Sequence, residues 1–455
     1  MRIWLSHCKI LVELLDMNGK KMFKEYSIYY YQSNISRMNS TKVTAIALFA
    51  IALLLLSAGC TQPAATPSGT TTTAPVSTTP SSGTVGILYT QGVGPMPGLL
   101  ATNQVDGYIA WQPVVEAGVE SGIGQVASYS KDLPPEGKWS DHPQNVFVVR
   151  QDFYDNNPDF VNAFSALNVA SDQYITDHPQ ESAGIVADWL AGKQNFTYGN
   201  VSVSSVTAVN NSIPTIRFTT EPSDAWKGSM NDFIQAQIDL GSINGFLKNG
   251  SAGDKESLLY NFTPYQNAQT IIATKNVTTP PVIKDPVTVG YLMAVDHSAL
   301  FVAVKDYQYF NDTYGIELKP QDPTKAKPDV ADFIVNGQKV AEVHLVSASA
   351  GPALMQLAAT NGIQMSYVGA PPAIAAIDQG IPIRITYPID NLGTGLVVTR
   401  GAPVQDWQSF AAWAKQRSDA GQPLVIAVPG KGSIQDVMLR YALQNSGFAT
   451  TEVKI

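Results

Sequence analysis

The sequence is poor in cysteine and in charge. Cys8 and Cys60 are its only cysteines among 455 residues, and 15% of the residues are charged. If the mature chain begins at Cys60, no intrachain disulfide can form, so stability must come from a hydrophobic core. The hydrophobic content of 44% and a mature length of about 395 residues are sufficient for two ordinary domains or lobes.

Motifs that would indicate catalysis, metal binding or nucleic-acid binding are also missing. Basic residues are not clustered and the net charge is -8, which argues against nucleic acid as a partner. The chain has no His-Glu-x-x-His run and no Cys-x-x-Cys pair, and the spacing around Gly430–Ser433 is not that of a P-loop. The histidines are scattered, at His7, His142, His178, His297 and His344. We therefore expect no enzyme activity, no cofactor and no metal site.

The run from Met38 to Cys60 has the order of a lipoprotein export signal. Lys42 precedes the uncharged stretch Val43–Leu56, and the small residues Ser57-Ala58-Gly59 lead to Cys60. A membrane-spanning helix is the alternative, but this stretch reaches only about 21 Å, short of a hydrocarbon core about 30 Å thick. Either Cys60 is lipidated or the stretch remains as an uncleaved anchor. Both outcomes place the protein outside the cytoplasm, attached to the cell membrane.

Three further segments are expected to lie outside the globular body. Residues 1–37 read as an N-terminal extension from a misassigned start of translation, and we exclude them from the fold. Residues 61–83 carry no charge and are rich in Thr, Ser and Pro, which predicts an extended stalk. Residues 276–286 contain three prolines and read as an internal linker.

The body shows an alternation of strands and helices. The apolar run 424–428 is followed by Gly430 and then by a helix that Ser433 opens, with Asp436 as its capping partner and Gly447 as its stop. The same order recurs over residues 365–387, with a strand, a helix from Pro371 to Asp378, and a second strand. Residues 158–192 and 222–260 have mostly helical patterns. The alternation predicts an α/β architecture with mainly parallel sheets.

Five runs of the body resemble the extracytoplasmic substrate-binding proteins of importers for nitrate, sulfonate, taurine and related solutes. They are Val289–Leu292, Asp296–Ala303, Gly369–Ile374, Val428–Asp436 and Val105–Pro113. The resemblance implies a type II periplasmic-binding-protein fold, with two Rossmann-like lobes joined by a hinge. It also implies a solute that binds between the lobes, and an ABC permease and ATPase as partners.

The order of these runs differs from the order in the family. There the Val289 strand comes first and the Trp111 segment follows the Ser433 helix, so this chain looks circularly permuted. One lobe is expected from residues 142–275 and 287–400, and the other from 84–135 and 405–455. The strand that ends at Ile455 reads as cut short, with Ile87–Gln91 as its continuation. A gene artefact, or a truncated tandem protein whose fragments do not close, is the alternative.

Two helix starts favour an anionic solute. Gly369 and Pro371 in one lobe, and Lys431, Gly432 and Ser433 in the other, lie between a strand and a helix. Unpaired backbone N–H groups and the positive end of the helix dipole attract anions at such positions. Ser433 either contacts the solute or only caps its helix. Lys431 is either a counter-charge or a solvated loop lysine.

The resemblance adds further candidates for solute contact. Asp296 and His297 begin the first helix and either touch the solute or cap that helix. The remaining candidates lie at a second cleft loop, at a crossing segment and at the segment where many relatives carry tryptophan before an acidic residue: Ser347, Ser349, Thr394, Trp111 and Gln112. Gln112 removes a negative charge relative to those relatives, which argues against a cationic solute.

Two functions from different classes remain open. The first is a membrane-attached solute-binding protein that delivers a small anion, such as a sulfonate, nitrate or bicarbonate, to a permease. The second is a membrane-attached sensing or adhesion domain with no role in transport, and a non-functional rearranged gene fragment is a third reading. A neighbouring permease gene would favour transport, and a neighbouring sensor-kinase gene would favour sensing.

Overall fold

The computed structural model describes residues 6–15, 21–30, 83–192 and 194–454, which fall into two units. In the first unit, β1 (Ser6–Leu15) and β2 (Lys21–Tyr30) pair antiparallel, with Ser6 opposite Tyr30. These strands belong to a unit separate from the body, and the interpretation of residues 1–37 as a misassigned extension stays a prediction. The export signal, Cys60 and residues 61–82 of the expected stalk lie outside the described residues, whereas Gly83 begins a strand of the body.

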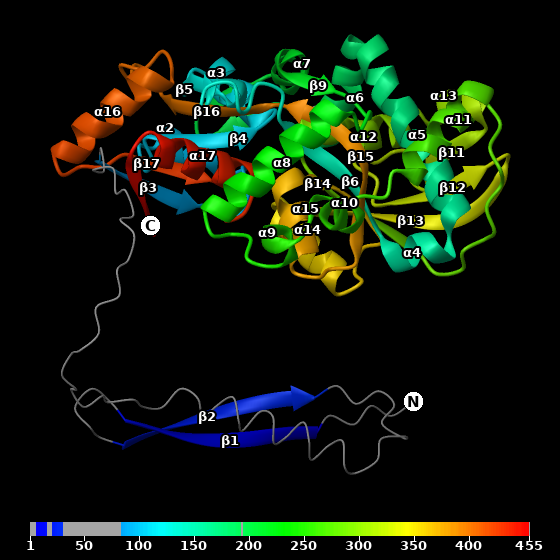
Figure 1. The fold of residues 1–455 in the computed structure, drawn as a ribbon, viewed down its shortest axis with the longest axis horizontal. Coiled ribbons are helices and arrows are strands. Elements are labelled where there is room, and N and C mark those ends of the chain that lie inside the picture. The colour runs from blue at the N-terminus through cyan, green and yellow to red at the C-terminus, as the bar shows by residue number, and fades with distance from the viewer. Residues whose placement is uncertain (1–5, 16–20, 31–82, 193, 455) are drawn as a thin grey trace. The chain divides into compact units, whose positions relative to one another are not determined.

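The second unit contains two lobes, each built around one sheet (Figure 1). The sheet of the first lobe has the strand order β11 (Ile316–Pro320), β12 (Val330–Val335), β13 (Gln338–Ala348), β10 (Val287–Leu292), β14 (Met365–Gly369), β6 (Pro143–Arg150), β15 (Ile383–Leu392) and β9 (Ile216–Phe218). The sheet of the second lobe has the order β18 (Phe448–Glu452), β3 (Gly83–Tyr89), β17 (Val425–Val428), β4 (Gly107–Trp111), β16 (Thr394–Thr399) and β5 (Gly124–Tyr129). The predicted α/β fold with two lobes is confirmed.

Helices cover both sheets. The first lobe carries α4 (Gln151–Asn156), α5 (Pro158–Asp177), α6 (Pro179–Ala191), α7 (Ser205–Ser212), α8 (Asp224–Asp239), α9 (Phe246–Asn249), α10 (Ala252–Leu259), α11 (Thr263–Thr274), α12 (Ser298–Lys305), α13 (Tyr307–Tyr314), α14 (Gly351–Ala359) and α15 (Ala370–Asp378). The second carries α2 (Met96–Ala101), α3 (Val114–Glu120), α16 (Trp407–Asp419) and α17 (Ile434–Asn445). Short 3-10 turns are η1 (Ser130–Asp132), η2 (Ile213–Thr215) and η3 (Val295–His297), and β7 (Phe196–Tyr198) pairs with β8 (Val201–Val203).

In the second lobe, helix α17 begins and ends where the sequence predicts. The Ser433 hydroxyl accepts a hydrogen bond from the Asp436 N–H at 3.2 Å, so Ser433 caps α17 as the capping pair predicts. The helix ends at Asn445, and Gly447 follows with a φ of +80°, a backbone conformation that glycine adopts without strain. In the described residues no helix is long and apolar enough to span a membrane.

The expectation of mainly parallel sheets is wrong for the first lobe. There β10 is parallel to β13 and β14, while β6 runs antiparallel to both β14 and β15. In the second lobe β17 is parallel to β3 and β4, but β16 is antiparallel to β4 and β5. Antiparallel pairing occurs at two places: β6, β15 and β16 lie next to the points where the chain crosses between the lobes, and β12 pairs antiparallel with β11 and β13 at the outer edge of the first sheet. A crossing strand returns in the direction opposite to the βαβ strands beside it.

The chain crosses between the sheets twice. It leaves the second lobe after β5 and enters the first at β6, and it returns between β15 and β16. Strand β16 therefore belongs to the second lobe, although the expected range 287–400 assigned it to the first. At the return crossing Leu392 and Gly393 have positive φ angles of +69° and +84°. Glycine tolerates this left-handed backbone, which reverses the chain within a few residues.

The C-terminal strand does not continue into the strand that contains Ile87. Instead β18 and β3 lie side by side in parallel, with Phe448 opposite Gly83 and Glu452 opposite Ile87. The expectation that they are two halves of one strand is wrong, because the two strands pair with each other side by side. Strand β18 is consequently an extra edge strand, and β3 holds the inner position beside β17.

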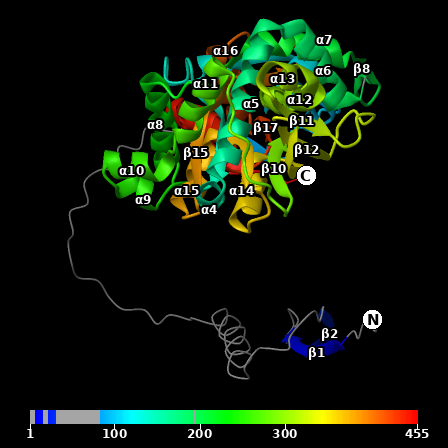
Figure 2. The same cartoon turned by 90° about the vertical axis from the view of Figure 1, so that its right-hand side faces the viewer.

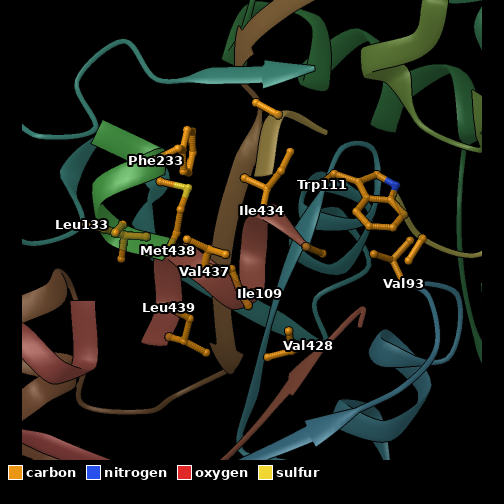
Figure 3. Close-up of a cluster of buried hydrophobic side chains, with 14 of the residues drawn as sticks. Val93, Ile109, Trp111, Leu133, Phe233, Val428, Ile434, Val437, Met438 and Leu439 are labelled. Atoms are coloured by element: carbon orange, nitrogen blue, oxygen red, sulfur yellow. The ribbon is translucent and has the colours of Figure 1, made fainter. Parts of the chain in front are cut away.

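Helix α8 contacts both lobes, through α17 of the second and through α15 and β6 of the first. Phe233 of α8 is buried in one cluster with Ile434 and Met438 of α17 (Figure 3). Val146 of β6 belongs to the same cluster. On the polar face of α8, Asp232 forms an ion pair at 2.7 Å with Lys138, which lies in the segment that crosses between the lobes. The remaining core lies in the first lobe, where α5 and α12 pack against each other (Figure 2).

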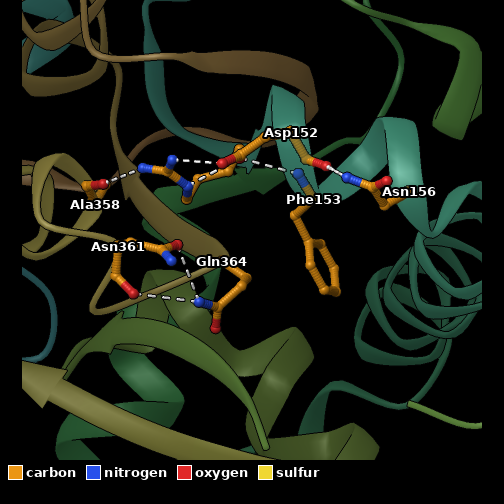
Figure 4. Close-up of polar contacts among 7 residues, drawn as sticks. Asp152, Phe153, Asn156, Ala358, Asn361 and Gln364 are labelled. Carbon is orange, nitrogen blue, oxygen red and sulfur yellow. Dashed lines mark hydrogen bonds and ion pairs between the residues drawn. The ribbon is translucent and has the colours of Figure 1, made fainter. Parts of the chain in front are cut away.

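The end of the first lobe that lies away from the second lobe is fixed by Arg150. Its Nη1 donates to the Ala358 carbonyl oxygen at 2.6 Å, and its Nη2 donates to Asp152 at 2.7 Å (Figure 4). The Arg150 side chain is largely buried, so its bond to the Ala358 carbonyl oxygen is shielded from water, whereas the Asp152 carboxylate is more than half exposed. The two interactions tie β6 to the end of α14 and to the start of α4.

Candidate functional site

A cavity lies between the two lobes at the ends of several strands. Its volume is about 20 Å³, which is room for about one water molecule. The second lobe contributes residues from the end of β4 and the start of α17, and the first contributes residues after β10 and β14 and from β6. The lining residues are Trp111, Gln144, Asn145, Leu292, Ala294, Asp296, His297, Gly351, Gly369, Pro372, Ser433, Ile434 and Gln435. The lobes are thus closed onto each other over a small space.

Five of the candidates from the sequence line this cavity. They are Trp111, Asp296, His297, Gly369 and Ser433. Trp111 ends β4 in the second lobe, and its indole N–H donates to the Met293 carbonyl oxygen of the first lobe at 3.4 Å. Residues from both lobes therefore meet at one point, although 182 positions of sequence number separate Trp111 from Met293.

Three candidates lie behind the cavity wall. The Thr394 hydroxyl accepts from the Gln435 side chain at 2.8 Å and from the Gln144 side chain at 2.9 Å, so it positions two amides that do line the cavity. Pro371 is buried in the first turn of α15, where its carbonyl oxygen accepts from Gln237. The Gly432 N–H donates to Asp436 within the start of α17.

Gln112 lies at a junction between the lobes. Its side chain is fully buried, and its Nε2 donates to Thr215 at 3.0 Å and to Glu116 at 3.3 Å. Its Oε1 accepts from the Ser212 hydroxyl at 3.1 Å. Because Ser212 and Thr215 belong to the first lobe, this amide joins the lobes beside the cavity without lining it.

Ser347, Ser349 and Lys431 do not line the cavity. Both serines are exposed at the end of β13, and the Ser349 carbonyl oxygen lies near Gly92 of the second lobe. The Lys431 side chain is 70% exposed and its Nζ lies 3.8 Å from the Glu452 carboxylate, which makes it a solvated lysine in this closed arrangement. No other lysine or arginine of the described residues lines the cavity either.

Three helices begin at the cavity. Gly351 starts α14, Gly369 caps α15 and Ser433 caps α17, and all three residues line the cavity. The first N–H groups of a helix have no partner within the helix, and the helix dipole places partial positive charge there. These starts give the cavity positive potential even though no cationic side chain reaches it.

Sequence reasoning missed the amides of the site. Gln144 and Asn145 begin β6, where the polar pair precedes the apolar run Val146–Val149, and Gln435 lies in the first turn of α17. A polar pair at the start of a buried strand is the signal that could have revealed the first two. Gln435 carries no such signal, because a glutamine in a first helical turn is common at solvent-exposed positions.

His297 is a neutral imidazole in a fixed tautomer. Its Nδ1 accepts from the Leu292 N–H at 2.8 Å, so its proton lies on Nε2, which faces the Asn145 side-chain oxygen at 3.2 Å. Burial lowers the pKa of His297 to about 3. The imidazole consequently supplies no positive charge near neutral pH, and it uses both nitrogens in hydrogen bonds to the protein.

Asp296 faces a second buried carboxyl group. Asp296 and Asp390 are both fully buried, and Asp390 Oδ1 accepts from the backbone N–H and the side chain of Asn145 at 2.9 and 3.0 Å. Burial raises the pKa of Asp390 to about 7, and the hydrogen bonds from Asn145 oppose this effect. Burial and the facing Asp390 raise the pKa of Asp296 well above its usual value. A carboxyl pair of this kind retains a proton near neutral pH.

The part of the chain that the structure describes contains no group of three or more His, Cys, Asp or Glu side chains placed to hold a metal ion. The site therefore consists of amides, one hydroxyl, one neutral imidazole, one tryptophan and a carboxyl pair. Such groups bind a solute by hydrogen bonds and by shape.

The comparison with known families gives this geometry a context. The sequence profile of the NMT1-like family matches residues 87–197 and 280–455, which together are more than half of the chain. The chain belongs to the NMT1-like family. NMT1-like proteins are binding proteins rather than enzymes, and they bind small solutes outside the cytoplasm in association with ABC transporters.

One curated relative has an unassigned function. An uncharacterized protein of Methanocaldococcus jannaschii is 34% identical over 108 residues, which are 24% of this chain and 70% of the relative. No solved structure matches the chain significantly. Both matched segments of the NMT1-like profile lie in the two-lobed body, and together they contain every lining residue of the cavity.

Proposed function

We propose that this NMT1-like protein is the extracytoplasmic solute-binding component of an ABC transporter and that it captures a small anion between its lobes. The observation that carries the proposal is the cavity at the junction of the lobes, onto which three helix starts open. The closed cavity has room for about one water molecule. A solute larger than water enters only when the lobes rotate apart, and closure then surrounds it.

The chemistry of the lining favours an anion over a cation. Backbone N–H groups at the starts of α14 and α17, together with the amides of Gln144 and Gln435, offer donors to the oxygens of a sulfonate, nitrate or bicarbonate. The start of α15 adds the Ala370 N–H alone, because Pro371 and Pro372 have no backbone N–H. A cation would require ionised carboxylates or aromatic faces, and the cavity has one tryptophan and one carboxyl pair with raised pKa values. Among the candidates, we assign direct contact to Trp111, His297, Asp296, Gly369 and Ser433.

The delivery step requires attachment outside the cytoplasm. Cys60 closes a lipoprotein-type signal, so a lipid on its sulfur, or the retained stretch Val43–Leu56, would hold the body at the membrane beside the permease and ATPase. Residues 61–83 would then be the stalk between the membrane and the two lobes.

The sheet of the second lobe supports a circular permutation of the family order. It combines β3, β4 and β5 from residues 83–129 with β16, β17 and β18 from residues 394–452, so remote parts of the chain close one lobe. A reordered chain that begins at Pro286, joins Ile455 to Gly83 through a flexible crossover linker of about a dozen residues and ends at Asn276 should bind the same anions with similar affinity, because β18 and β3 are parallel neighbours. Loss of the folded second lobe in that chain, seen in its circular dichroism and unfolding curve, would contradict the permutation.

Thermal melting of the purified body with a panel of anions tests the function. A ligand at one hundred times its dissociation constant stabilises a protein by about 2.7 kcal/mol. We expect one of methanesulfonate, nitrate or bicarbonate to raise the melting temperature, whereas choline and lysine leave it unchanged. The absence of a shift with every anion would refute the proposal, and a shift with the cations alone would reverse the assigned charge of the solute.

A further inference from the structure

We infer that the solute of this protein binds together with a proton, which the carboxyl pair Asp296 and Asp390 holds at the wall of the cavity. The inference rests on the proposed function, because it takes the solute to be an anion in the cleft. It adds that the affinity for this anion depends on the protonation of the carboxyl pair. No covalent step is involved: the proton stays on the pair and the anion enters beside it.

Asp296 is the residue of the pair that meets the solute. It lines the cavity, its side chain is fully buried, and no N–H or hydroxyl group of the described residues donates to its carboxyl oxygens, whose polar neighbour is the Asp390 carboxyl group. A buried polar group without a partner costs about 1–3 kcal/mol, so native proteins seldom leave one in place. A solute oxygen beside a protonated Asp296 would supply the missing partner.

Asp390 determines which oxygens carry the proton. Two donors of Asn145 occupy its Oδ1, whereas its Oδ2 receives no donor from any other residue in the described part of the chain. The carboxyl groups of Asp390 and Asp296 face one another. Two facing carboxylates in a dry site repel each other, and one shared proton removes that repulsion. A second proton, taken up with the anion, then lies on the Asp296 carboxyl group and is donated toward the cavity.

The other titratable groups near the pair do not replace this role. Asp172 of α5 faces Asp390 from inside the lobe, and burial raises its pKa, but it does not line the cavity. His297 is neutral, since burial lowers its pKa to about 3, and burial raises the pKa of both Tyr367 and Tyr387 far above neutrality. No lysine or arginine contributes to the pKa shifts of Asp296 and Asp390. Among the described residues that line the cavity, Asp296 is therefore the one titratable group whose pKa is raised by burial and by the facing Asp390.

A dependence of affinity on pH follows from this arrangement. When both carboxyl groups are ionised, an incoming anion meets two negative charges in a site of low dielectric constant. When the pair carries both protons, it has no net charge and the anion meets a hydrogen-bond donor. Affinity for the anion should therefore be constant at low pH and fall by about tenfold per pH unit above the pKa of the pair.

Calorimetry on the unmodified protein measures the proton directly. Methanesulfonate and nitrate are suitable probes, because both remain anions between about pH 5 and about pH 9 and add no titration of their own. Titrations in buffers with different ionisation enthalpies give the number of protons taken up for each anion bound. We expect uptake to approach one proton at the alkaline end of the range and to vanish at the acid end.

Two variants separate the pair from its surroundings. In Asp296→Asn the amide replaces the protonated carboxyl group as a donor, so the affinity should no longer change with pH. Asp172→Asn removes a buried carboxyl group that also faces Asp390 but lies off the cavity, and it should keep the alkaline fall in affinity. If Asp296→Asn fails to fold, proton uptake by the unmodified protein still decides the question.

The outcomes are distinguishable. If neither methanesulfonate nor nitrate binds at any pH, the proposed anion-binding function fails, and this inference fails with it. If either anion binds with no proton uptake and no change of affinity with pH, the inference alone is overturned. Affinity that rises with pH would show that an ionised Asp296 attracts positive charge, which would also overturn it.

Discussion

The side chain of Ile434 in the second lobe lies directly against the backbone of Gly369 in the first. A Cβ atom at Gly369 would lie 2.8 Å from both Cδ1 and Cγ1 of Ile434, closer than real carbon contacts permit. Gly369 has an ordinary φ of -57°, so its lack of a side chain serves this contact rather than its backbone conformation. The closed arrangement depends on this one missing methyl group.

Gly369→Ala should accordingly weaken the closed state. We expect a loss of about 1–3 kcal/mol in the free energy of unfolding, as for other overpacked sites, together with weaker anion binding. In the double variant with Ile434→Ala, part of the lost free energy of unfolding should be recovered. A double-mutant cycle measured by urea unfolding should give a coupling energy of about 0.5–3 kcal/mol. Gly184→Ala in α6 is the matched control, because its new methyl group meets open space. Additive effects of the two substitutions would contradict the contact.

Ser433→Ala tests whether the α17 cap also serves the solute. Loss of the cap should cost about 0.5–2 kcal/mol of stability. Ser251→Ala is the matched control, since Ser251 caps α10 in the same way but far from the cavity. Both variants should have a lower melting temperature than the unmodified protein. Only in Ser433→Ala should an anion raise the melting temperature by less than it does in the unmodified protein. Equal rises in the two variants would reduce Ser433 to a cap.

Gln112→Met tests the amide that joins the lobes. The apolar side chain keeps the volume but leaves Thr215 and Ser212 without this partner in a buried place. We expect a loss of about 1–3 kcal/mol in chemical unfolding, the cost of buried groups left unsatisfied. Gln408→Met, at an exposed position of α16, should change stability by less than about 0.5 kcal/mol. A similar small change in Gln112→Met would mean that these bonds add nothing to stability.

The carboxyl pair should make stability depend on pH. The pKa of Asp390 is raised to about 7 and that of Asp296 well above its usual value, so the folded protein keeps protons that the unfolded chain releases above about pH 4. Stability from the pair is fully present below about pH 4 and is lost as the pH rises toward about 7. The slope is about 1.4 kcal/mol per pH unit for each proton.

Asp390→Asn should reduce the dependence of the unfolding free energy on pH by the contribution of about one proton. Buried His142 and His297 act in the opposite direction, because burial lowers their pKa values to about 4 and about 3, and the unfolded chain gains protons below about pH 6.5. The difference between the unfolding free energies of the unmodified protein and Asp390→Asn isolates the pair from the histidines. Asp419→Asn controls for the loss of a surface charge. A difference that stays constant across the range would contradict a shared proton.

Cys60→Ser tests the proposed attachment. In cells fed a labelled fatty acid, the unmodified protein should carry label and enter the detergent phase on phase separation, since a thioether-linked lipid anchor is strongly apolar. The serine variant should lose the label. If it still enters the detergent phase, the stretch Val43–Leu56 acts as an uncleaved anchor. Label on the serine variant would place the lipid at another residue.

Local signals of the sequence predicted the elements around the site well. The apolar runs that end at Val368 and Val428, the small residues after them and the Ser433–Asp436 pair lie next to each other in the chain, and short-range rules of capping and strand length apply to them. For the same reason the two lobes and their α/β class were predictable. The part of the site that these signals cover is the pair of helix starts at Gly369 and Ser433.

Long-range contacts explain what the sequence did not reveal. Asp390 is one polar residue within a long strand, and only the antiparallel pairing of β15 with β6 brings it to Asn145 and Asp296. Lys431 belongs to the same loop as Ser433, but its side chain points to solvent and pairs with Glu452. Strand direction next to the crossings depends on where the chain passes between lobes, which no single run of residues encodes.

The two crossings also have a consequence for how the protein folds. The first lobe is one continuous chain segment from β6 to β15, inserted into the second lobe, whose strands come from both sides of that insertion. A continuous segment can complete its sheet early, whereas the second lobe must first bring together strands that are remote in sequence. Once the first lobe has folded, the loop to be closed is short, since both ends leave from neighbouring strands. We therefore expect the first lobe to act as the template on which the second lobe assembles.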